Sequence, residues 1–321
     1  MIISKTPLRI SFAGGGTDLP SFYKHNDHGA VLSTSIDSYL YVTLKKQSPL
    51  FFEKYRLNYS ETELVKDIEK IKNPIIRESL KFMQMDEHLY ISTISDIPGF
   101  SGLGSSSSFC VGLLNALYKY KGNNVSSGRL AEEAAYIEIE MLKRPMGKQD
   151  HYVAAYGGLN YFRFNADGTV TVKPIMVSNR VIDLLFQSML SFWTGMVRPS
   201  ESVLAEQDKN HSKNIENLSI MRQQAEELSN LLCSDDFSIE RFGKVIHAGW
   251  QLKRRLASQV SNPKIDKYYD VAIKNGACGG KISGAGSGGF LNIFAKTADH
   301  SNITNALQKE GVARLKLLVQ H

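Results

Sequence analysis

The amino-acid sequence predicts an α+β protein with two domains, residues 1–178 and 179–321. The first observation is that strand-like and helix-like patterns alternate over the first 178 residues. The second is a shift of composition past residue 178 to long polar segments of helical character. The third is a pair of glycine-rich loops, Pro98–Ser108 and Lys281–Gly289, about 180 positions apart. Two such loops can face one ligand across a cleft between domains.

The predicted elements follow the chain in order. Strands are expected at 2–12, 29–33, 40–44 and 89–94, and a charged helical segment interrupted at Pro74 is expected at 61–85. Helices are expected at 109–117 and 128–143, and a hairpin at 159–164 and 169–174. The second half is expected to hold helices at 200–232, 238–258, 264–275 and 299–310 and strands at 290–295 and 312–319.

The segment Pro98–Ser108 carries the strongest functional signal. It joins a predicted strand to a predicted helix, and four serines follow its glycines. This order favours an anion site, because glycines let the backbone approach a ligand and a helix N-terminus offers unpaired N–H groups. The serine hydroxyls suit phosphate oxygens or a bridging metal ion. A plain turn with a serine N-cap is the alternative, and the loop lacks the Walker lysine and the dinucleotide fingerprint.

A second glycine run, Gly14–Gly16, is followed by Thr17 and Asp18. Its backbone can approach a ligand, and it ends in a hydroxyl and a carboxylate. The alternative is a glycine-rich turn in which Asp18 forms an Asx-turn or a cap. Arg9, inside the first predicted strand, can likewise be a surface residue.

Two further carboxylates are candidates for chemistry. The predicted helix 128–143 has one apolar stripe, formed by Leu130, Ala134, Ile137 and Met141. Glu138 and Glu140 lie at its two boundaries, where a carboxylate is either partly buried and aimed into a cleft or a surface charge. Asp150 precedes an apolar run, so it is either a helix cap or a general base held at a helix start, close to Lys148.

Length and composition exclude several classes of protein. The chain has 321 residues, of which 42% are hydrophobic and 22% charged, as in ordinary globular proteins. No apolar run approaches a membrane helix and no signal-peptide core is seen near the N-terminus, so we expect a cytoplasmic protein. The three cysteines form no zinc or disulfide pattern. The net charge of +6 suits small anions, and Lys253–Arg255 is interpreted as a solvated face rather than a nucleic-acid stripe.

Three segments together resemble the signatures of the GHMP kinases, the superfamily of galactokinase, homoserine kinase, mevalonate kinase and phosphomevalonate kinase. They are Pro7–Pro20, Pro98–Ser108 (form P-x-x-x-G-L-G-S-S) and Lys281–Gly289 (form K-x-S/T-G-A-G-x-G-G), in the family's order and spacing. Gly147–Gly158 matches the segment that carries the catalytic aspartate in galactokinase-like members. The resemblance implies a ribosomal-protein-like βαβ domain, a ferredoxin-like C-terminal domain and an active site in the cleft between them.

The resemblance also implies roles for individual residues. Asp150 would be the catalytic base, and Arg9 the cation that keeps it ionised and stabilises the transferring phosphoryl group. The phosphates of ATP would bind at Gly102, Leu103, Gly104, Ser105, Ser106 and Ser107. Mg²⁺ would be held by Ser106, with Ser105 or Ser107 as alternatives, and by Glu138, with Glu140 in reserve. Substrate would be bound at Gly15, Gly16, Thr17, Asp18, Lys148, Arg198, Gly284 and Gly286.

One departure from galactokinases bears on the substrate. Where they carry Gly-Glu-His-Thr-Asp, this chain has three glycines before Thr17 and Asp18, so two galactose-reading side chains are absent. The long first signature, together with 73–78, looks most like the heptose-phosphate kinases of bacterial capsule or lipopolysaccharide synthesis. This resemblance implies transfer to the anomeric hydroxyl of D-glycero-D-manno-heptose 7-phosphate, giving the 1,7-bisphosphate, with Lys148 or Arg198 at the substrate's own phosphate.

Three alternatives stay open. They are a kinase for an unphosphorylated hexose such as fucose or galactose, a kinase for mevalonate or homoserine, and a non-catalytic sugar-sensing relative. The presence of Asp150, Arg9 and Glu138 favours catalysis, and the spacing from Gly147 to Asp150 favours the sugar branch. The expected partners are a sugar phosphate and ATP, with no nucleic acid and no membrane, and a homodimer is left open.

Overall fold

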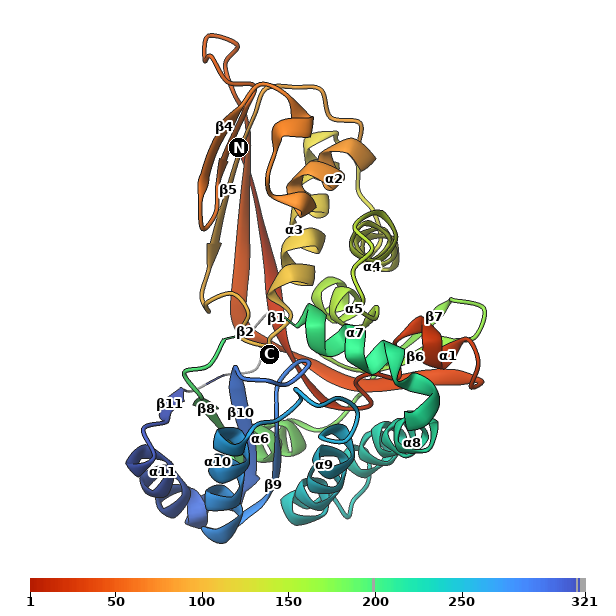
Figure 1. Cartoon of the computed structure of the whole chain (residues 1–321), viewed down its shortest axis with the longest axis vertical. Coiled ribbons are helices and arrows are strands. Elements are labelled where there is room, and N and C mark those ends of the chain that lie inside the picture. Colours follow the sequence, from red (N-terminus) through yellow and green to blue (C-terminus); the bar gives the residue numbers. More distant parts are fainter. Residues whose placement is uncertain (198–199, 316, 318–321) are drawn as a thin grey trace.

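The computed structural model describes residues 1–197, 200–315 and 317. Its strands form one sheet of seven strands and one of four (Figure 1). Every strand of the first sheet ends by Pro174, and every strand of the second begins at Met189 or later. The α+β class is therefore confirmed. The predicted boundary after residue 178 falls between β7 (Val170–Pro174) and α6 (Asn179–Gln187), and it stays a prediction.

The first sheet is mixed. Its order is β4-β3-β5-β2-β6-β7, and β1 pairs with β2 outside this path. The bounds of the strands other than β7 are β1 (Ile2–Ala13), β2 (His28–Lys46), β3 (Tyr55–Asn58), β4 (Thr62–Val65), β5 (Leu89–Ser95) and β6 (Leu159–Asn165). The pair β3–β5 is parallel and the other pairs are antiparallel.

The prediction of two strands at 29–33 and 40–44 is wrong, because β2 is one continuous strand of 19 residues. Its first part pairs with β6 and its last part with β5. β1 pairs along β2 from Leu32 to Leu44 and so spans the segment between these two parts. Within that segment, Ser35 lies opposite Arg9 and Tyr39 opposite Pro7. The backbone of the central segment is thus held in the sheet by a strand distant in sequence, which local pattern does not reveal.

The prediction of a helical segment over 61–85 is also largely wrong. Residues 62–65 form β4, a short 3₁₀ turn follows at Ile68–Lys70, and the helix α2 spans only Pro74–Phe82. The Glu63 carboxylate accepts hydrogen bonds from the backbone N–H groups of Lys72 (2.7 Å) and Asn73 (3.1 Å), which holds the turn. Pro74 starts the helix rather than interrupting one, as its fixed φ permits at a first helical position.

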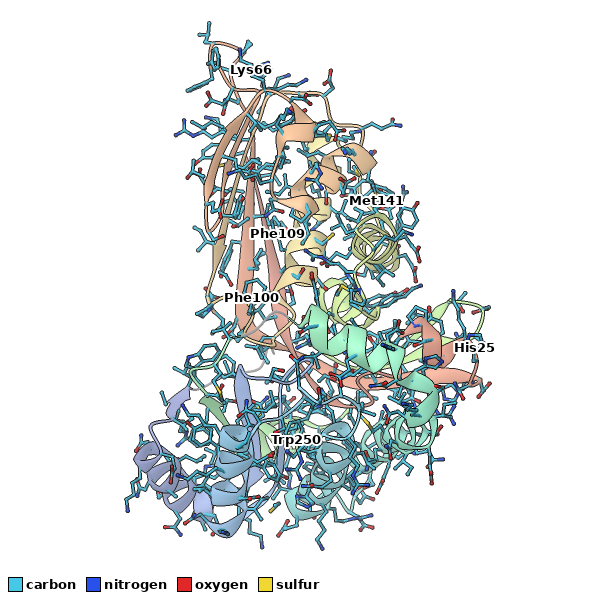
Figure 2. All side chains as sticks on the ribbon, viewed as in Figure 1. His25, Lys66, Phe100, Phe109, Met141 and Trp250 are labelled. Carbon is cyan, nitrogen blue, oxygen red and sulfur yellow. The ribbon has the colours of Figure 1, made fainter. Side chains whose placement is uncertain are left out.

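Helices pack on one side of the upper part of this sheet (Figure 1). They are α2, α3 (Ser105–Tyr120), α4 (Ser127–Ala135) and α5 (Gln149–Tyr156). Helix α3 packs against β1 and β2 and is buried on nearly every face, with Phe109 on its first turns (Figure 2). The predicted helix at 128–143 is observed as one helical stretch to Met141, in which α4 passes into a π-helical segment at Tyr136–Met141.

The second sheet is antiparallel, with the order β11-β8-β10-β9. Its strands are β8 (Met189–Trp193), β9 (Ala277–Ile282), β10 (Phe290–Ala295) and β11 (Ala313–Leu315). Its helices are α6, α7 (Glu201–Lys209), α8 (Ile215–Leu232), α9 (Ile239–Lys253), α10 (Pro263–Lys274) and α11 (His300–Lys309). The sequence does not predict α6, β8 or β9, and the helix expected at 200–232 is two helices, α7 and α8. β9 is missed because Gly279 and Gly280 do not resemble a strand. A side chain at Gly279 would overlap the Gly243 carbonyl, so glycine allows α9 to pack closely on β9.

The two sheets share an aromatic cluster that joins the halves of the molecule. Phe12 of β1 packs edge-on against Phe242 of α9 (ring centroids 5.5 Å apart) and Phe294 of β10 (6.1 Å). Aromatic pairs at such distances are stabilising beyond their buried area. This cluster places the end of β1, and the glycine run after it, against the second sheet. No helix within the described residues is long and apolar enough to cross a membrane.

Candidate active site

A cleft of about 590 Å³ is lined by residues from both halves of the chain. All three glycine-rich segments contribute to its wall: Gly15–Gly16, Gly102–Ser107 and Gly284–Gly288. Asp150 and Lys253 lie in the same wall. The volume is that of an ordinary small-molecule site. Segments that are remote in sequence therefore meet around one space, as the sequence predicted for the two longer loops.

The two longer loops touch through their backbones. Gly102 has φ +80°, and a Cβ there would lie 2.6 Å from the Ser283 carbonyl oxygen. Gly284 has φ +66°, and a Cβ there would lie 2.9 Å from the Gly102 Cα. Side chains at these positions would separate the loops, so glycine is required for both the conformation and the approach.

Gly102→Ala tests this contact. We expect the variant to unfold more easily than Gly122→Ala by about 1–3 kcal/mol, because only the first substitution pushes a Cβ against backbone. Gly122 has nearly the same φ, +76°, with no atom within 4 Å of the added Cβ. Thermal unfolding of the two variants makes the comparison. Equal losses of stability would show that the close approach of the loops is unimportant.

The N-terminus of α3 is open toward the cleft. Its N-cap is Gly104, in the left-handed region at φ +79°, and no side chain caps the first N–H groups. The alternative of a serine N-cap is therefore not observed. Ser105, Ser106 and Ser107 line the cleft, and the buried Ser107 Oγ has no hydrogen-bond partner among the described residues. Free N–H groups, the helix dipole and an orphaned hydroxyl fit a bound phosphate.

Leu103 has a different part in this loop. Its side chain is buried, and its carbonyl accepts a hydrogen bond from the Arg9 backbone N–H at 3.0 Å. The side chain packs among the apolar residues shared by the two halves and does not line the cleft. Leu103 thus anchors the loop to β1.

Asp150 and Arg9 form a two-pronged ion pair in the wall of the cleft. Arg9 Nε donates to Asp150 Oδ1 at 2.7 Å and Nη2 to Oδ2 at 2.5 Å. Arg9 Nη1 donates to the Gly102 carbonyl at 2.5 Å. A fork-to-fork pair fixes both groups more firmly than a single contact does. Asp150 does not cap α5, because the N-cap is Lys148 and the carboxylate faces Arg9.

This pair lies directly beside the serine loop. A Cβ at Gly104 would lie 3.1 Å from Arg9 Cγ and 3.4 Å from Asp150 Oδ2. A phosphate at the N-terminus of α3 and a hydroxyl at Asp150 would therefore be neighbours. The arrangement can place a proton acceptor and a cation on either side of a transferring phosphoryl group.

Glu138 lies behind the serine loop and is fully buried, not at a boundary as the helical pattern suggested. Its carboxylate accepts hydrogen bonds from Ser106 Oγ at 2.5 Å and His151 Nε2 at 2.9 Å, and it pairs with Arg144. Burial raises its pKa, but His151, Ser106 and Arg144 together hold that pKa below the ordinary value for glutamate.

The π-helical segment explains the difference. A π turn inserts an extra residue into the helical register, and such turns are frequent at functional sites. The predicted stripe is still observed, since Leu130, Ala134 and Ile137 are buried in one cluster and Met141 packs against it. Glu140 points away: it is exposed and pairs with Lys143 at 3.3 Å. Glu140 therefore has no place in a metal site.

Ser106 and Glu138 fit a magnesium ion by chemistry. Their hydroxyl and carboxylate oxygens are adjacent, and Mg²⁺ prefers hard oxygen ligands while keeping several waters. The same two oxygens face a cation in this structure, the guanidinium of Arg144. Within the described residues, no group of three or more His, Cys, Asp or Glu side chains could hold a metal ion.

The metal assignment can be tested with three variants. Ser106→Ala and Glu138→Gln should raise the Mg²⁺ concentration for half-maximal activity by about tenfold or more, since each loses an oxygen ligand or its charge. Glu140→Gln is the matched control and should behave as the unmodified chain. Titrating activity against Mg²⁺ decides between them, with thermal unfolding as a check on folding. An unchanged requirement in both variants would remove these residues from the metal site.

The glycine run after β1 forms a second wall. Asp18 is buried and lines the cleft, where it accepts hydrogen bonds from the N–H groups of Gly16 (3.0 Å) and Gln149 (3.2 Å). Burial raises the pKa of the Asp18 carboxyl, the two N–H groups oppose this, and the Asp150 carboxylate adds to it. Thr17 does not line the cleft, because its hydroxyl donates to the Gly14 and Ala30 carbonyls and holds the loop.

The space beside Gly16 is not left open by the absence of the two galactose-reading side chains. A Cβ at Gly16 would lie 3.3 Å from Leu218 and 3.8 Å from both Leu256 and Gln207 Oε1. The second half of the chain thus fills part of the room that the missing side chains leave. At Gly15 a Cβ would meet only ordinary contacts, the nearest to Gln149 at 3.7 Å.

One predicted cation, Lys148, does not serve the cleft in the described structure. Lys148 turns to the other side, where its ammonium pairs with Glu132 at 2.9 Å and donates to the Gly168 carbonyl at 2.9 Å. Lys148 therefore does not contact a ligand in the cleft. Arg198 lies outside the described residues. Gly284 and Gly286 both line the cleft, as expected.

Sequence reasoning missed several residues of the cleft, among them Arg144, Lys253 and Gln207. Lys253 was interpreted as part of a solvated face, but its side chain is buried and its ammonium donates to the Gly284 carbonyl. Gln207 of α7 is also buried and lines the cleft. Nothing local distinguishes Lys253 from its neighbours Arg254 and Arg255, because its orientation depends on how α9 packs.

Comparison with known proteins agrees with this geometry. Residues 53–158 match the model of the GHMP kinases N terminal domain, and residues 226–313 match that of the GHMP kinases C terminal region. The chain belongs to the GHMP kinase superfamily, and it is a phosphotransferase with an alcohol acceptor. The family resemblance and the two-domain fold inferred from the sequence are confirmed.

Individual relatives are similar along most of the chain. The D-glycero-alpha-D-manno-heptose 7-phosphate kinase of Campylobacter jejuni is 31% identical, over 96% of this chain and 94% of its own. A galactokinase of Pyrococcus furiosus is 25% identical, over 98% and 94%. The crystal structure of a D-glycero-D-manno-heptose 1-phosphate kinase from Bacteroides thetaiotaomicron has a TM-score of 0.81 at 24% identity, covering 99% of this chain and 96% of that one. The similarity to this crystal structure shows the fold of the chain.

Proposed function

We propose that this sugar kinase transfers the γ-phosphoryl group of ATP to the anomeric hydroxyl of D-glycero-D-manno-heptose 7-phosphate, giving the 1,7-bisphosphate. The observation that carries the kinase chemistry is the Asp150–Arg9 pair beside the open N-terminus of α3. The heptose phosphate is supported by the 31% identity to the Campylobacter jejuni enzyme over nearly its full length. The product would supply nucleotide-activated heptose for surface polysaccharide.

The nucleotide would bind in the same cleft as the serine loop. The cleft lining includes apolar side chains at Leu40, Ile75 and Phe109 and polar ones at Asn73 and Ser95. A purine has apolar faces and polar edges, so a wall of this composition suits adenine. The triphosphate would then reach the free N–H groups of α3, with Ser106 and Glu138 as ligands for the accompanying Mg²⁺, which neutralises phosphate charge.

The transfer follows from the placement of Asp150 and Arg9. The acceptor hydroxyl would lie against the Asp150 carboxylate, and its oxygen would attack the γ-phosphorus in line with the bond to ADP. One P–O bond forms to the sugar, the P–O bond to ADP breaks, and the hydroxyl proton passes to Asp150. Arg9 would stabilise the charge on the transferring phosphoryl oxygens while it continues to hold the carboxylate.

The substrate is tested by measuring ADP release over a panel of possible acceptors. The panel contains heptose 7-phosphate, heptose 1-phosphate, galactose, fucose and mevalonate, at fixed ATP and Mg²⁺. We expect the highest kcat/KM with heptose 7-phosphate and a product that carries the new phosphate on C1. Turnover of free hexoses and none of the heptose phosphate would overturn the substrate while leaving the kinase class intact.

A second candidate acceptor is an unphosphorylated hexose. The observation that favours it is the environment of one predicted phosphate-binding cation, Lys148, whose ammonium faces Glu132. Both arginines of the described cleft lining, Arg9 and Arg144, are likewise paired with carboxylates. An acceptor without its own phosphate would need no further cation at its far end. The same panel distinguishes the two, because galactose and fucose are members of it.

A further inference from the structure

The cations of the cleft differ in how their charge is compensated. In the described lining there are three: Arg9, Arg144 and Lys253. Arg9 pairs with Asp150, and Arg144 with Glu138 and Glu201. The Lys253 ammonium has no carboxylate partner within ion-pair distance in the described structure, and it donates a hydrogen bond to one carbonyl, that of Gly284. An ammonium can donate three hydrogen bonds, so Lys253 retains capacity for a ligand.

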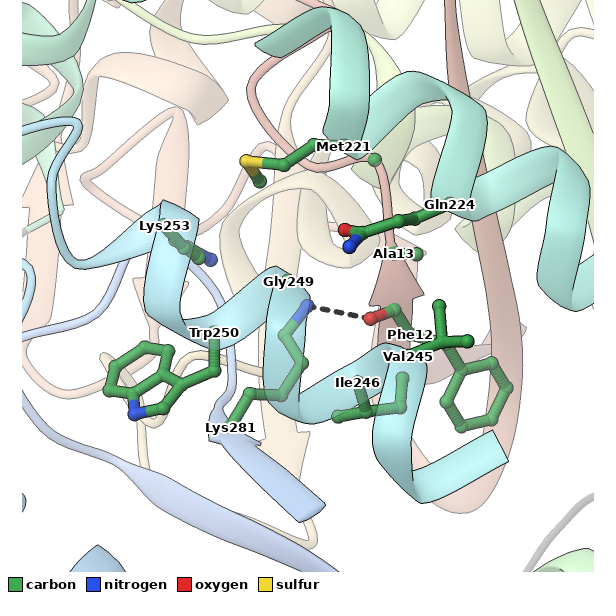
Figure 3. Close-up of a pocket in the computed structure, with 11 residues that line it drawn as sticks. Phe12, Ala13, Met221, Gln224, Val245, Ile246, Gly249, Trp250, Lys253 and Lys281 are labelled. Atoms are coloured by element: carbon green, nitrogen blue, oxygen red, sulfur yellow. Dashed lines mark hydrogen bonds between the residues drawn. The ribbon is translucent and has the colours of Figure 1, made fainter. Parts of the chain in front are cut away.

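Lys253 is nevertheless buried, with 5% of its surface exposed. It lies at the end of α9, next to Trp250 and above Lys281, whose ammonium donates to the Phe12 carbonyl at 3.1 Å (Figure 3). Two buried lysines so close to each other and to Arg9 form a concentration of positive charge. Burying an uncompensated charge is costly, and such groups are commonly kept for binding or catalysis.

Gln207 provides an independent observation on the same wall. It is 5% exposed, and its amide Nε2 is buried without a hydrogen-bond partner among the described residues. Its Oε1 lies 3.8 Å from the position of a Cβ on Gly16, the residue whose N–H binds Asp18. An unpaired buried amide costs about 1–3 kcal/mol unless something binds it. The amide is therefore a ready donor for a ligand oxygen beside Asp18.

We propose that Lys253 and Gln207 bind the acceptor sugar at its reacting end, with Lys253 donating to the attacking oxygen and Gln207 to a neighbouring hydroxyl. This inference rests on the proposed function, because it assigns both donors to the acceptor of that reaction. The Asp18 carboxylate would accept a hydrogen bond from a hydroxyl at the same end of the sugar. Two donors and one acceptor would then surround the reacting end of the sugar. In this chain, side chains from α7 and α9 take the place of the readers that Gly15 and Gly16 lack.

The charge of Lys253 gives the proposal a signature in the pH dependence. Burial, with Arg9 next, lowers the pKa of Lys253 to about 8, while Asp18 and Asp150 oppose the shift. The ammonium is therefore charged below pH about 8 and becomes a neutral amine above it. Burial, Lys253 and Arg9 also lower the pKa of Lys281, so the pH at which activity falls does not by itself show which lysine is responsible. Substitution of Lys253 shows whether that lysine is responsible.

The experiment measures kcat/KM for the best sugar of the panel from pH 6 to 10. In the unmodified chain it should fall above pH about 8, since kcat/KM reports the free enzyme. Lys253→Met should lower it about 10- to 100-fold and remove that fall, whereas Lys253→Arg should retain more activity and move the fall to higher pH. Gln207→Leu should raise the acceptor KM by up to about tenfold. The control is Lys244→Met, an exposed lysine of the same helix.

Binding of a fluorescent ATP analogue separates this role from a structural one. If Lys253 merely supports the Gly284 loop, Lys253→Met weakens nucleotide binding and leaves the pH profile in place, which overturns the inference. Acceptor kinetics of Lys253→Met and Gln207→Leu equal to those of Lys244→Met would overturn it as well. Absence of turnover with every sugar by the unmodified chain would instead overturn the proposed function, and this inference with it.

Discussion

We expect Asp150→Asn to abolish measurable turnover and to leave ATP binding nearly intact. The amide keeps the shape of the carboxylate but cannot take the proton of the attacking hydroxyl, and it loses the charge that Arg9 holds through two hydrogen bonds. General-base catalysis typically contributes about 10²–10⁴-fold, so we expect a fall of at least about 10³ in kcat. Sugar-dependent ADP release measures the rate, and a fluorescent ATP analogue measures the binding.

The matched control for this variant is Asp270→Asn on α10. Asp270 is an exposed aspartate outside the cleft, and its replacement should leave both measurements unchanged. Full activity in Asp150→Asn would show that this carboxylate has no part in proton transfer. A sugar-sensing relative without catalysis would give no turnover in either variant or in the unmodified chain.

We expect Arg9→Ala to lower the rate by about 10²–10³-fold, with a smaller effect on nucleotide affinity. The guanidinium holds both oxygens of Asp150 and the Gly102 carbonyl, so its loss removes the cation and releases the base and the loop together. Removal of one group that stabilises developing charge typically costs this much. Steady-state kinetics with a fixed sugar and varied ATP measure the effect.

Arg9→Lys distinguishes charge from geometry. A lysine restores the charge but cannot bind both carboxylate oxygens in a planar fork. We expect it to recover only part of the lost rate. Complete recovery would show that the two-pronged contact with Asp150 is unimportant, and no recovery would assign the effect to orientation. Thermal unfolding should accompany both variants, since Arg9 is buried and an unpaired Asp150 would weaken the fold.

Most elements with a strong local pattern were predicted from the sequence. The serine loop, α3, the β6–β7 hairpin and the helices α9, α10 and α11 follow from glycine positions and from apolar spacing. The errors occurred where a distant strand decides the outcome. β1 keeps β2 continuous, and β3 draws residues 62–65 into the sheet although their charges suggested a helix. Pairing energy between remote strands is not visible in a local window.

The residues of the candidate site also separate into those that sequence motifs predict and those whose position depends on distant neighbours. Asp150, Arg9 and the serine loop were identified through motifs, and the structure brings them together at hydrogen-bonding distances. The family resemblance implies Glu138 as the metal ligand, with Glu140 in reserve, but the sequence does not predict the full burial of Glu138. Lys148 was expected to face the ligand, but Glu132 offers a closer carboxylate on the other side. Side-chain direction depends on neighbours that sequence order does not place.

What the sequence determined by itself is the chemistry available to this protein: glycines that allow backbone to approach phosphate, serines and a glutamate for a hard cation, and an aspartate and an arginine for proton and charge. Those properties belong to single residues and short runs. The tertiary structure alone decided which side chains share the cleft. Lys253 and Gln207 reach it because α9 and α7 pack beside the glycine run. Thr17 and Lys148 do not, because hydrogen bonds hold their side chains elsewhere. Burial and partner choice are properties of the whole fold, and they turn a set of reactive groups into a site.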